Sequence, residues 1–444
     1  MKRIKWIYGV SFAVLSALWL LAEQPWAQSY DFFRLRSAIV NYTGILAMGA
    51  MSVAMMLAIR PMWVEPLLGG LDKSYRLHKW LGIGALVTGV LHWLWAQGAK
   101  WAVGWGWLTK PVRGPRPEYD NLVFRFFQQV HEFAEHSGEW AFYAAAALIV
   151  LALIKYFPYR WFFKTHRLIA IAYLVLAFHS VVLIRISYWQ SPVAWVMALL
   201  IAGGVAGVVL SLTRRIGQQR RALGKVEALA YNQNHRVLKV DIRFDKDRWE
   251  GHRAGQFAFV TFDDGEGAHP FTISSAWNDD GLLHFHVKEL GDYTNRLSAT
   301  LKAGDRATVE GPYGCFRFES DRPQQVWVAG GIGITPFMAR MEERMQRGET
   351  KNAVDLFYSV KNPDEAFIAG LRQSAEAAGV ALHVVDSDRD GFFDADKLRA
   401  AVPQWQDASV WFCGPAGFGQ ALRQGLKQAG FDGSHFHQEL FDMR

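Results

Sequence analysis

Cysteine is scarce in this 444-residue chain, which contains two, Cys315 and Cys413. Two thiols exclude the disulfide framework of a small secreted protein, and they indicate a reducing compartment for the part of the chain that holds them. The sequence also lacks a calcium-binding helix–loop–helix pattern and a long regulatory insertion, so we expect no internal calcium control. The net charge is +7, and its basic residues cluster beside apolar runs. That placement favours membrane orientation over nucleic-acid binding.

Long apolar runs divide the chain into two parts. Up to about residue 212 such runs follow one another, whereas the sequence from residue 213 onward is that of a soluble protein. The 19 tryptophans, mostly in the first part, often lie near the ends of these runs, as in an interfacial aromatic belt. We therefore expect six membrane spans, at about residues 6–22, 37–59, 79–97, 139–157, 167–185 and 191–212.

The first apolar run has a second interpretation. Basic residues, an apolar run and the sequence PWAQ resemble a secretory signal peptide, although the run is long for such a signal. Six spans give a consistent topology, because Lys and Arg are more frequent in the segments that lie inside if the N-terminus is inside. The sequence thus predicts a multi-pass protein of the plasma (inner) membrane, with its N-terminus and its second part in the cytoplasm.

Two of the apolar runs carry histidine near both ends. Residues 77–95 contain His78 and His92, fourteen positions apart, and residues 165–180 contain His166 and His179, thirteen apart. Histidine is costly in hydrocarbon, and packing alone gives no reason to repeat the spacing. Fourteen residues of helix separate two side chains by ~21 Å, which fits two sites stacked across a bilayer core. Paired imidazoles from neighbouring helices are one way to hold two haems.

The thirteen-residue spacing leaves three alternatives for the second helix. At ~100° per residue, fourteen residues return to nearly the same face, whereas thirteen miss it by ~140°. The helix could wind loosely, carry a π-bulge or present its two histidines to different flanks.

The long connection before the fourth span ends in HEFAEH, which contains His131, Glu132, Glu135 and His136. A metal site is conceivable here. A polar entry to the helix is the simpler interpretation.

The second part of the chain contains two kinds of pattern. From residue 225 to 318, short alternating strands are divided by Gly and Asp, which predicts a small antiparallel β-barrel. From about residue 323, strands alternate with helical stretches, which predicts a parallel α/β sheet. The expected fold is thus multidomain, with an all-α six-helix transmembrane haem domain (1–212), a linker (213–224), an antiparallel β-barrel domain (225–318) and an α/β nucleotide-binding domain (319–444).

A glycine-rich loop at residues 329–337 (AGGIGITPF) follows a predicted strand and opens a helix. Such glycines let the backbone approach a pyrophosphate, which the helix N-terminus then binds. Pro336 stands where a Rossmann fingerprint has its third glycine, so the loop alone is a weak signal. The loop becomes a stronger indication of nucleotide binding when it is taken together with two other motifs, residues 269–275 (HPFTISS) upstream and 413–415 (CGP) downstream.

These motifs, with residues 288–294 (KELGDYT) and 311–316 (GPYGCF), occur in the order and spacing of the ferredoxin reductase-like FAD/NAD module. Joined to six spans with paired histidines, the whole chain resembles the NADPH oxidase and ferric reductase superfamily. The resemblance implies that His78 with His166, and His92 with His179, ligate an inner and an outer b-type haem.

The resemblance also implies roles in the second part of the chain. Thr272, Cys413 and Phe441 would act at the flavin: the Thr272 hydroxyl near its N5, Cys413 near the face of hydride transfer, and Phe441 over the ring. The FAD would be lined by His269, Pro270, Phe271 and Thr272, and its phosphates held by His286, Lys288 and Thr294. The nicotinamide dinucleotide would be held by Gly331, Gly333, Thr335 and Pro336, with Cys413, Gly414 and Pro415 beside it. As alternatives, Lys288 is an ordinary surface lysine and Cys413 a small buried residue.

The implied activity is electron transfer from cytoplasmic NADPH or NADH, through FAD and two haems, to an external small molecule. Oxygen, giving superoxide, and a ferric chelate are both compatible, although Ala96 stands where some oxidases of the family carry a further histidine. Lys361 could meet a 2′-phosphate or be a solvated lysine. A membrane subunit that passes electrons to a partner protein is the alternative function. The complete motifs favour a self-contained enzyme with the lipid bilayer as its surroundings and no obligate protein partner.

Overall fold

The computed structural model describes residues 2–109, 119–154, 156–262, 267–349 and 352–439. The chain divides into two compact units. Of the described residues, the first contains 2–64 and 73–216, and the second contains 65–72 and those from 217 to 439. Each unit is described by itself.

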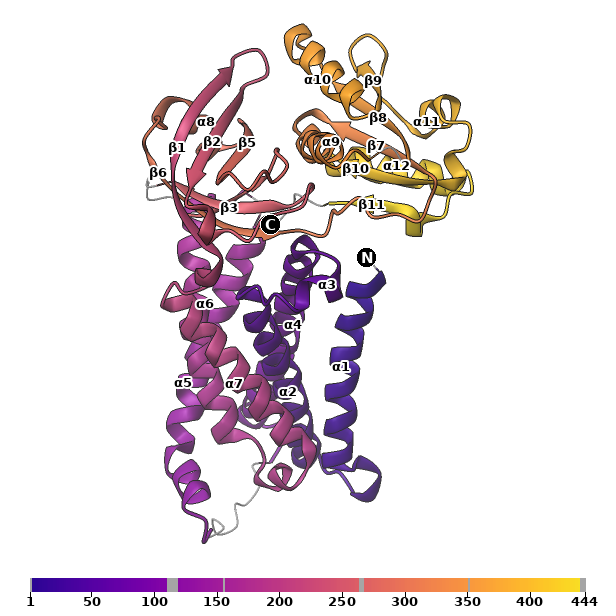
Figure 1. Cartoon of the computed structure of the whole chain (residues 1–444). Helices are drawn as coiled ribbons and strands as arrows, with labels where there is room; N and C mark the ends of the chain where they lie inside the picture. Colours follow the sequence, from indigo (N-terminus) through magenta and orange to yellow (C-terminus); the bar gives the residue numbers. More distant parts are fainter. Residues whose placement is uncertain (1, 110–118, 155, 263–266, 350–351, 440–444) are drawn as a thin grey trace. The chain divides into compact units, whose positions relative to one another are not determined.

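Among the described residues, six long helices lie wholly or mostly in the first unit (Figure 1). They are α1 (Lys2–Glu23), α2 (Phe32–Ala58), α4 (Leu71–Gly104), α5 (Leu122–Leu153), α6 (Tyr159–Leu183) and α7 (Pro192–Leu212). Side-chain caps fix two of the starts: Asp31 accepts from Arg34 N at 2.7 Å, and Asn121 accepts from Val123 N at 2.8 Å.

Five of the described helices, α1, α2, α5, α6 and α7, are long and apolar enough to cross a membrane. Helix α4, with its two histidines, has 34 residues but is not among the five. Its glycines, tryptophans and histidines lower its average hydropathy. Five of the six expected spans are thus supported, and the span at 79–97 stays a prediction.

Small residues let helices of this unit approach closely. A Cβ on Gly204 of α7 would lie 2.0 Å from the Tyr173 hydroxyl of α6. That hydroxyl is fully buried and lies 2.8 Å from Ser52 Oγ on α2. Glycine on α7 therefore allows a polar contact among three helices, as is common in helical membrane proteins.

The second unit contains a six-stranded antiparallel sheet in the order β4-β3-β6-β1-β2-β5. Its elements are β1 (Arg221–Asn232), β2 (Val237–Phe244), β3 (Phe257–Phe262), β4 (His269–Thr272), β5 (Leu282–Lys288), α8 (Asp292–Thr300) and β6 (Arg306–Tyr313). An isolated bridge between Ile273 and Phe285 brings the edge strands together. The antiparallel sheet expected from the alternating pattern is confirmed. Strand β1 begins at Arg221, inside the segment expected to be a linker.

A five-stranded parallel sheet follows, in the order β11-β10-β7-β8-β9, as expected (Figure 1). Its elements are β7 (Gln324–Gly330), η5 (Gly331–Ile334), α9 (Thr335–Arg347), β8 (Ala353–Val360), α10 (Glu365–Ala377), β9 (Ala381–Asp386), α11 (Ala395–Ala401), β10 (Ala408–Cys413), α12 (Ala416–Gln428) and β11 (Phe436–Gln438). The chain runs outward on both sides of β7, so the strand order reverses between β7 and β10. A crevice at such a reversal is where open α/β sheets bind ligands.

Short elements complete the chain. They are α3 (Val64–Leu68), η1 (Pro25–Ala27), η2 (Ile186–Gln190), η3 (Gln218–Arg220), η4 (Lys246–Arg248), η6 (Trp405–Asp407) and η7 (Gly433–His435). Residues 65–72 belong to the second unit, where Gly314 N donates to Glu65 Oε1 at 2.6 Å.

Candidate functional site

The four histidines of the first unit form two pairs between α4 and α6. The ring centres of His78 and His166 lie 5.9 Å apart, and those of His92 and His179 lie 6.2 Å apart. Two imidazoles on opposite sides of one metal ion, with metal–nitrogen bonds of ~2 Å, would have ring centres ~6 Å apart. Both spacings therefore suit a metal held between the rings.

Three of the four rings are oriented by a main-chain carbonyl of a neighbouring helix. The Nδ1 atoms of His78, His92 and His179 lie 2.9 Å from the carbonyl oxygens of Ala54, Val40 and Ala134, respectively. A carbonyl only accepts, so each Nδ1 carries the proton and each Nε2 keeps its lone pair for a metal. His166 instead stacks on Phe162 at 5.1 Å, and its Nδ1 has no hydrogen-bond partner among the described residues.

Glycine provides the space for the second pair. A Cβ on Gly138 of α5 would lie 2.0 Å from His179 Nδ1, and one on Gly44 of α2 would lie 3.2 Å from His92 Nδ1. Helix α6 is regular through both histidines, without a π-turn. Of the three alternatives for the thirteen-residue spacing, the structure favours histidines presented to different flanks, with His179 turned toward α5. The geometry fits two bis-histidine haems.

The HEFAEH segment lies on α5 as a polar part of that helix. Glu135 pairs with Lys100 Nζ at 3.0 Å, and Glu139 accepts from Gln97 at 2.8 Å. Within the described ranges, no group of three or more metal-ligating side chains is found. The position on α5 and these polar contacts are those expected of a polar entry to the helix.

The reversal point of the parallel sheet is lined by the two motifs expected there. A Cβ on Gly333 would lie 2.2 Å from the carbonyl oxygen of Cys413, and one on Gly414 would lie 3.0 Å from the Gly330 main chain. A Cβ on Gly330 would lie 2.8 Å from Pro415. The loops after β7 and β10 therefore interlock, which only glycine permits at these positions.

Gly331 differs from the other glycines of the loop. Its φ is +55°, and apart from its chain neighbours the described residues place one heavy atom within 4 Å of a Cβ built on it, Lys288 Nζ at 3.9 Å. Helix α9 starts just beyond, where Thr335 Oγ1 donates to Ile332 O at 3.1 Å and Pro336 occupies the first turn. Thr335 N donates to Ile332 O and Pro336 has no amide hydrogen, so a diphosphate at this loop would meet the glycine turn Gly331–Ile334 before the first amides of α9.

Cys413 ends β10 with a fully buried side chain. Burial, followed by the charge of Glu439, raises the pKa of the Cys413 thiol well above its usual value. The thiol therefore stays protonated at neutral pH and can act only by its position and size.

The flavin motif occupies β4 at the edge of the antiparallel sheet. Thr272 pairs with Phe257 in the ladder, and its hydroxyl makes no hydrogen bond with a described residue. His269 stacks in parallel on Tyr293, with ring centres 3.8 Å apart. Thr272 thus has a donor available at the edge, and the stack joins β4 to the start of α8.

His286 and Thr294, both predicted at FAD phosphates, are engaged within the protein. Ser274 donates its single hydroxyl proton to His284 O, so Ser274 Oγ accepts from His286 Nδ1, 2.8 Å away. Burial, with the charge of Lys239, lowers the pKa of His286 to about 4, so the ring is neutral and its Nε2 lacks a proton. Thr294 Oγ1 accepts from Leu290 N and Gly291 N, at 2.9 and 3.1 Å, and so closes the start of α8.

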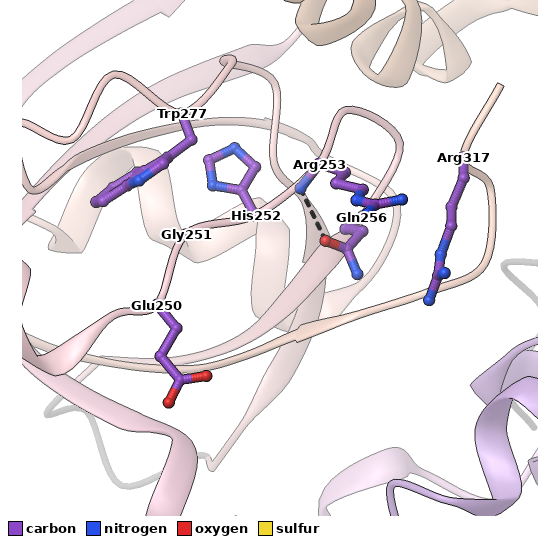
Figure 2. Close-up of a pocket in the computed structure, with 7 residues that line it drawn as sticks. All are labelled: Glu250, Gly251, His252, Arg253, Gln256, Trp277 and Arg317. Carbon is purple, nitrogen blue, oxygen red and sulfur yellow. Dashed lines mark hydrogen bonds between the residues drawn. The ribbon is translucent and has the colours of Figure 1, made fainter. Parts of the chain in front are cut away.

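A cavity of about 390 Å³ lies elsewhere in the second unit (Figure 2). It is lined by Glu250, Gly251, His252, Arg253, Gln256, Trp277 and Arg317. His252 donates to Ser275 O across 2.8 Å, and Arg253 N donates to Gln256 Oε1, also across 2.8 Å. None of the predicted cofactor residues lines this cavity, and no sequence motif pointed to it.

Phe441 lies outside the described residues. Its role over the flavin stays a prediction.

Three family matches cover successive parts of the chain. Residues 43–177 match the family described as "Ferric reductase like transmembrane component". Residues 223–317 match "FAD-binding domain", and residues 327–424 match "Oxidoreductase NAD-binding domain".

Curated proteins and solved structures are similar to part of the chain. The glycine betaine monooxygenase reductase subunit of Chromohalobacter salexigens is 29% identical over 43% of this chain and 56% of its own length. A flavohemoprotein of Halalkalibacterium halodurans is 30% identical over 41% of this chain and 43% of its own. The chain spans about half the length of the curated relatives it matches. An Amycolatopsis cytochrome P450 reductase structure is 23% identical, over 50% of this chain and 70% of that one, with a TM-score of 0.43.

Proposed function

We propose that this oxidoreductase carries electrons across a membrane. It has the architecture of the ferric reductase and NADPH oxidase-like flavocytochromes, which combine a transmembrane component with FAD- and NAD-binding domains. The donor is cytoplasmic NADPH or NADH. The route is FAD and then two b-type haems, and the acceptor is an external small molecule, either oxygen, giving superoxide, or a ferric chelate.

The pairing of histidines at both ends of α4 and α6 is the observation that carries this proposal. Both pairs have ring spacings that suit one metal, at 5.9 and 6.2 Å. His78 and His166 would hold the inner haem, and His92 and His179 the outer one. Because two histidines would hold each iron, the external acceptor would take its electron without binding the metal.

The second unit would supply single electrons from a two-electron donor. FAD, when bound, accepts a hydride and passes electrons on one at a time. Thr272 would donate its hydroxyl proton toward flavin N5, and Cys413 would shape the face of hydride transfer. His269, Pro270, Phe271, Gly331, Gly333, Thr335, Pro336, Gly414 and Pro415 would line the two nucleotides, and Phe441 would cover the flavin.

For the membrane arrangement we retain the proposal made from the sequence. We propose that α4 also crosses the membrane, as the third of six spans of a haem domain at residues 1–212. The linker expected at 213–224 then ends where β1 begins at Arg221, and the FAD domain to residue 318 and the nucleotide domain at 319–444 follow. The N-terminus and the second unit lie in the cytoplasm, and the protein resides in the plasma (inner) membrane. The bilayer is its surroundings, with no nucleic acid and no obligate protein partner.

Nucleotide choice depends on the carboxyl end of β8. Lys361 there pairs with Asp388 at 3.5 Å and remains largely exposed. The Asp388 carboxylate offsets the charge that would attract a 2′-phosphate, so both nucleotides remain candidates.

A second candidate function is an electron-transfer subunit that reduces a partner protein. It is favoured by the name of one similar protein, a monooxygenase reductase subunit.

The two functions separate in one experiment. Purified full-length protein with FAD and haem should oxidise NADPH or NADH without any other protein, in the presence of oxygen or of ferric citrate. Superoxide dismutase added to a cytochrome c readout identifies superoxide, and an anaerobic run with ferric citrate identifies iron reduction. Reduction of the haems by nucleotide, with no turnover on either acceptor, would favour the subunit; haems that stay oxidised would refute both.

A further inference from the structure

Residues 386–397 (DSDRDGFFDADK) run from the last residue of β9 into the first turn of α11 and have the spacing of a calcium-binding loop (Figure 1). Such a loop has twelve residues, with oxygen ligands at positions 1, 3, 5, 7 and 9, glycine at position 6 and glutamate at position 12. The residues at positions 1, 3, 5, 6, 7 and 9 are Asp386, Asp388, Asp390, Gly391, Phe392 and Asp394. Position 12 is Lys397, so a cation stands where the last anionic ligand would be.

The main chain of this loop makes the turn that the spacing requires. Gly391 has a φ of +70°, the left-handed conformation that glycine allows at the sixth position. Asp386 Oδ1 accepts from Asp388 N at 3.1 Å, and Asp390 Oδ2 accepts from Asp386 N at 3.0 Å. Phe393, at position 8, is buried in a core beside the parallel sheet. The loop is therefore closed across its first five positions and anchored by its eighth.

The Lys397 side chain reaches back from α11 into the loop. Its Nζ donates to the carbonyl oxygen of Asp390 at 2.6 Å and to that of Phe392 at 2.8 Å. The main-chain carbonyl at position 7, here that of Phe392, coordinates the metal ion in a calcium-binding loop. Because an ammonium carries a positive charge and three donors, it can bind the oxygen atom that a metal ion would otherwise bind.

The carboxylates of the loop also have partners within the protein. Asp390 pairs with the arginine before it at 2.8 Å, and Asp394 accepts from Lys397 N at 2.9 Å and so caps α11. In the parts of the chain that the structure describes, no group of three or more His, Cys, Asp or Glu side chains is placed to hold a metal ion. The acidic residues thus shape the turn instead of converging on a common point.

We propose that the Lys397 ammonium is the built-in cation of this loop, and that it holds the turn which a divalent metal ion holds in other loops of this spacing. The nucleotide-binding part of the chain then folds without calcium. The turn also has a place in the fold, since Asp388 pairs with Lys361, the first residue after β8, at 3.5 Å. Lys397 therefore helps to hold an acidic side chain at the carboxyl edge of the parallel sheet, where sheets of this kind bind ligands. The inference goes beyond the proposed function and does not depend on it.

The test is hydrogen–deuterium exchange of the full-length protein, followed by mass spectrometry of peptides that span residues 386–397. Lys397→Met keeps the aliphatic stem but removes the charge and both hydrogen bonds to the carbonyls. We expect exchange in this loop to be roughly tenfold faster or more, as for the loss of hydrogen bonds to a charged group. Millimolar calcium chloride should leave exchange in the wild-type loop unchanged.

A charge reversal tests whether the loop is built for a cation. Lys397→Glu supplies the missing ligand at position 12, so its loop should exchange fast without calcium and slowly with millimolar calcium. Calorimetry with calcium chloride should give a dissociation constant on the order of 10⁻⁴ M, as for weak natural sites. Lys427→Glu makes the same charge change at an exposed position of α12 and should show neither response.

Three results would overturn the inference. They are wild-type exchange rates in the loop of Lys397→Met, slower exchange of the wild-type loop on addition of calcium, and a Lys397→Glu loop that calcium does not protect. If Lys397→Met does not fold, Lys397→Arg and Lys397→Gln replace it. The arginine variant keeps a cation and should retain most of the protection, whereas the glutamine variant should lose it; equal exchange in the two would also refute the role of the charge.

Discussion

The two units differ in where their large apolar side chains face. In the first unit, Trp6, Trp140 and Leu199 are 72%, 73% and 74% exposed. In the second, Trp327, Phe337 and Phe412 are completely buried in cores around the parallel sheet. The two units are therefore suited to different surroundings. The apolar surface of the first unit is stable in hydrocarbon, and the surface of the second unit is stable in water.

Polar side chains show the same contrast. Thr43, Ser52 and Thr88 of the first unit donate to carbonyls four residues back in their own helices. In the second unit, side chains more often pair with side chains across strands, as His284 does with Asp241 at 2.5 Å. Without water, the main chain is the nearest acceptor, and the histidine anchors to main-chain oxygens are one instance of this rule.

The largest expected effect tests whether the histidine pairs are independent. His92→Ala should remove the outer haem and leave the inner one, because His78 and His166 are held by other contacts. A pyridine haemochrome assay should fall from two haems per chain to one. His131→Ala, also a histidine of the first unit but outside the pairs, should keep both; loss of both haems in well-folded His92→Ala would contradict independent sites.

A smaller change should disturb the same haem without removing a ligand. In Gly138→Ala, the new methyl would lie 2.0 Å from His179 Nδ1 and displace the ring from its carbonyl anchor. We expect reduced occupancy of the outer haem, seen in its low-spin optical and electron paramagnetic resonance signals. Gly82→Ala on α4 is the control, since nothing lies within 4 Å of its added methyl. Normal signals in Gly138→Ala would contradict the prediction, and they would mean that α5 moves to make room for the added methyl group.

A buried ion pair tests how the first unit tolerates charge. Glu23, 1% exposed, accepts from Arg185 at 2.6 and 2.8 Å and also from Tyr188 and Tyr30. Glu23→Ala should lower the free energy of unfolding of this unit by about 3 kcal/mol, because it leaves the guanidinium without its partner. Thermal unfolding monitored by haem absorbance measures the loss.

The control for that change lies in the second unit. Glu227 pairs with Arg243 at the surface, and Glu227→Ala should leave the unfolding temperature nearly unchanged, since exposed pairs contribute little. Equal effects of the two substitutions would remove the contrast between the units.

The smallest expected effect is a pH dependence of the second unit. The pKa of His286 is lowered by burial to about 4 in the folded protein, whereas an unfolded histidine titrates near 6.5. As pH falls from 6.5 toward 4, only the unfolded state takes up the proton, so stability is lost across that window and is unaffected above it. His286→Gln should flatten the stability–pH curve there. An unchanged slope in His286→Gln would place the titrating group elsewhere.

Patterns of sequence predicted the elements that repeat. Alternation in β2 and β5, the apolar runs of α2 and α7, and the glycine loop before α9 each follow a local rule, and each was found where expected. The number of membrane spans was harder to predict from the sequence. His78, His92 and the glycines of α4 suit it to the proposed haem sites, but they also lower the hydropathy of this helix. The cavity around His252 and Trp277 could not be predicted from local sequence patterns, because residues of separate loops line it.

The sequence also could not predict the direction in which individual side chains point. The sequence placed Lys288 in a strand beside a flavin motif, but the direction of its ammonium depends on how the two sheets pack. In the same way, thirteen residues between His166 and His179 left three alternatives, and the choice among them depended on the neighbouring helix α5 and its Gly138.

The interlocked loops after β7 and β10 have an evolutionary consequence. Gly330, Gly333, Cys413 and Gly414 share contacts so close that a side chain added to one glycine would enter the space of the opposite loop. Substitutions here cannot accumulate one at a time, because each requires a matching change about eighty residues away in the chain. Among relatives, the two loops should therefore be inherited as one block, while the surface around them is free to diverge.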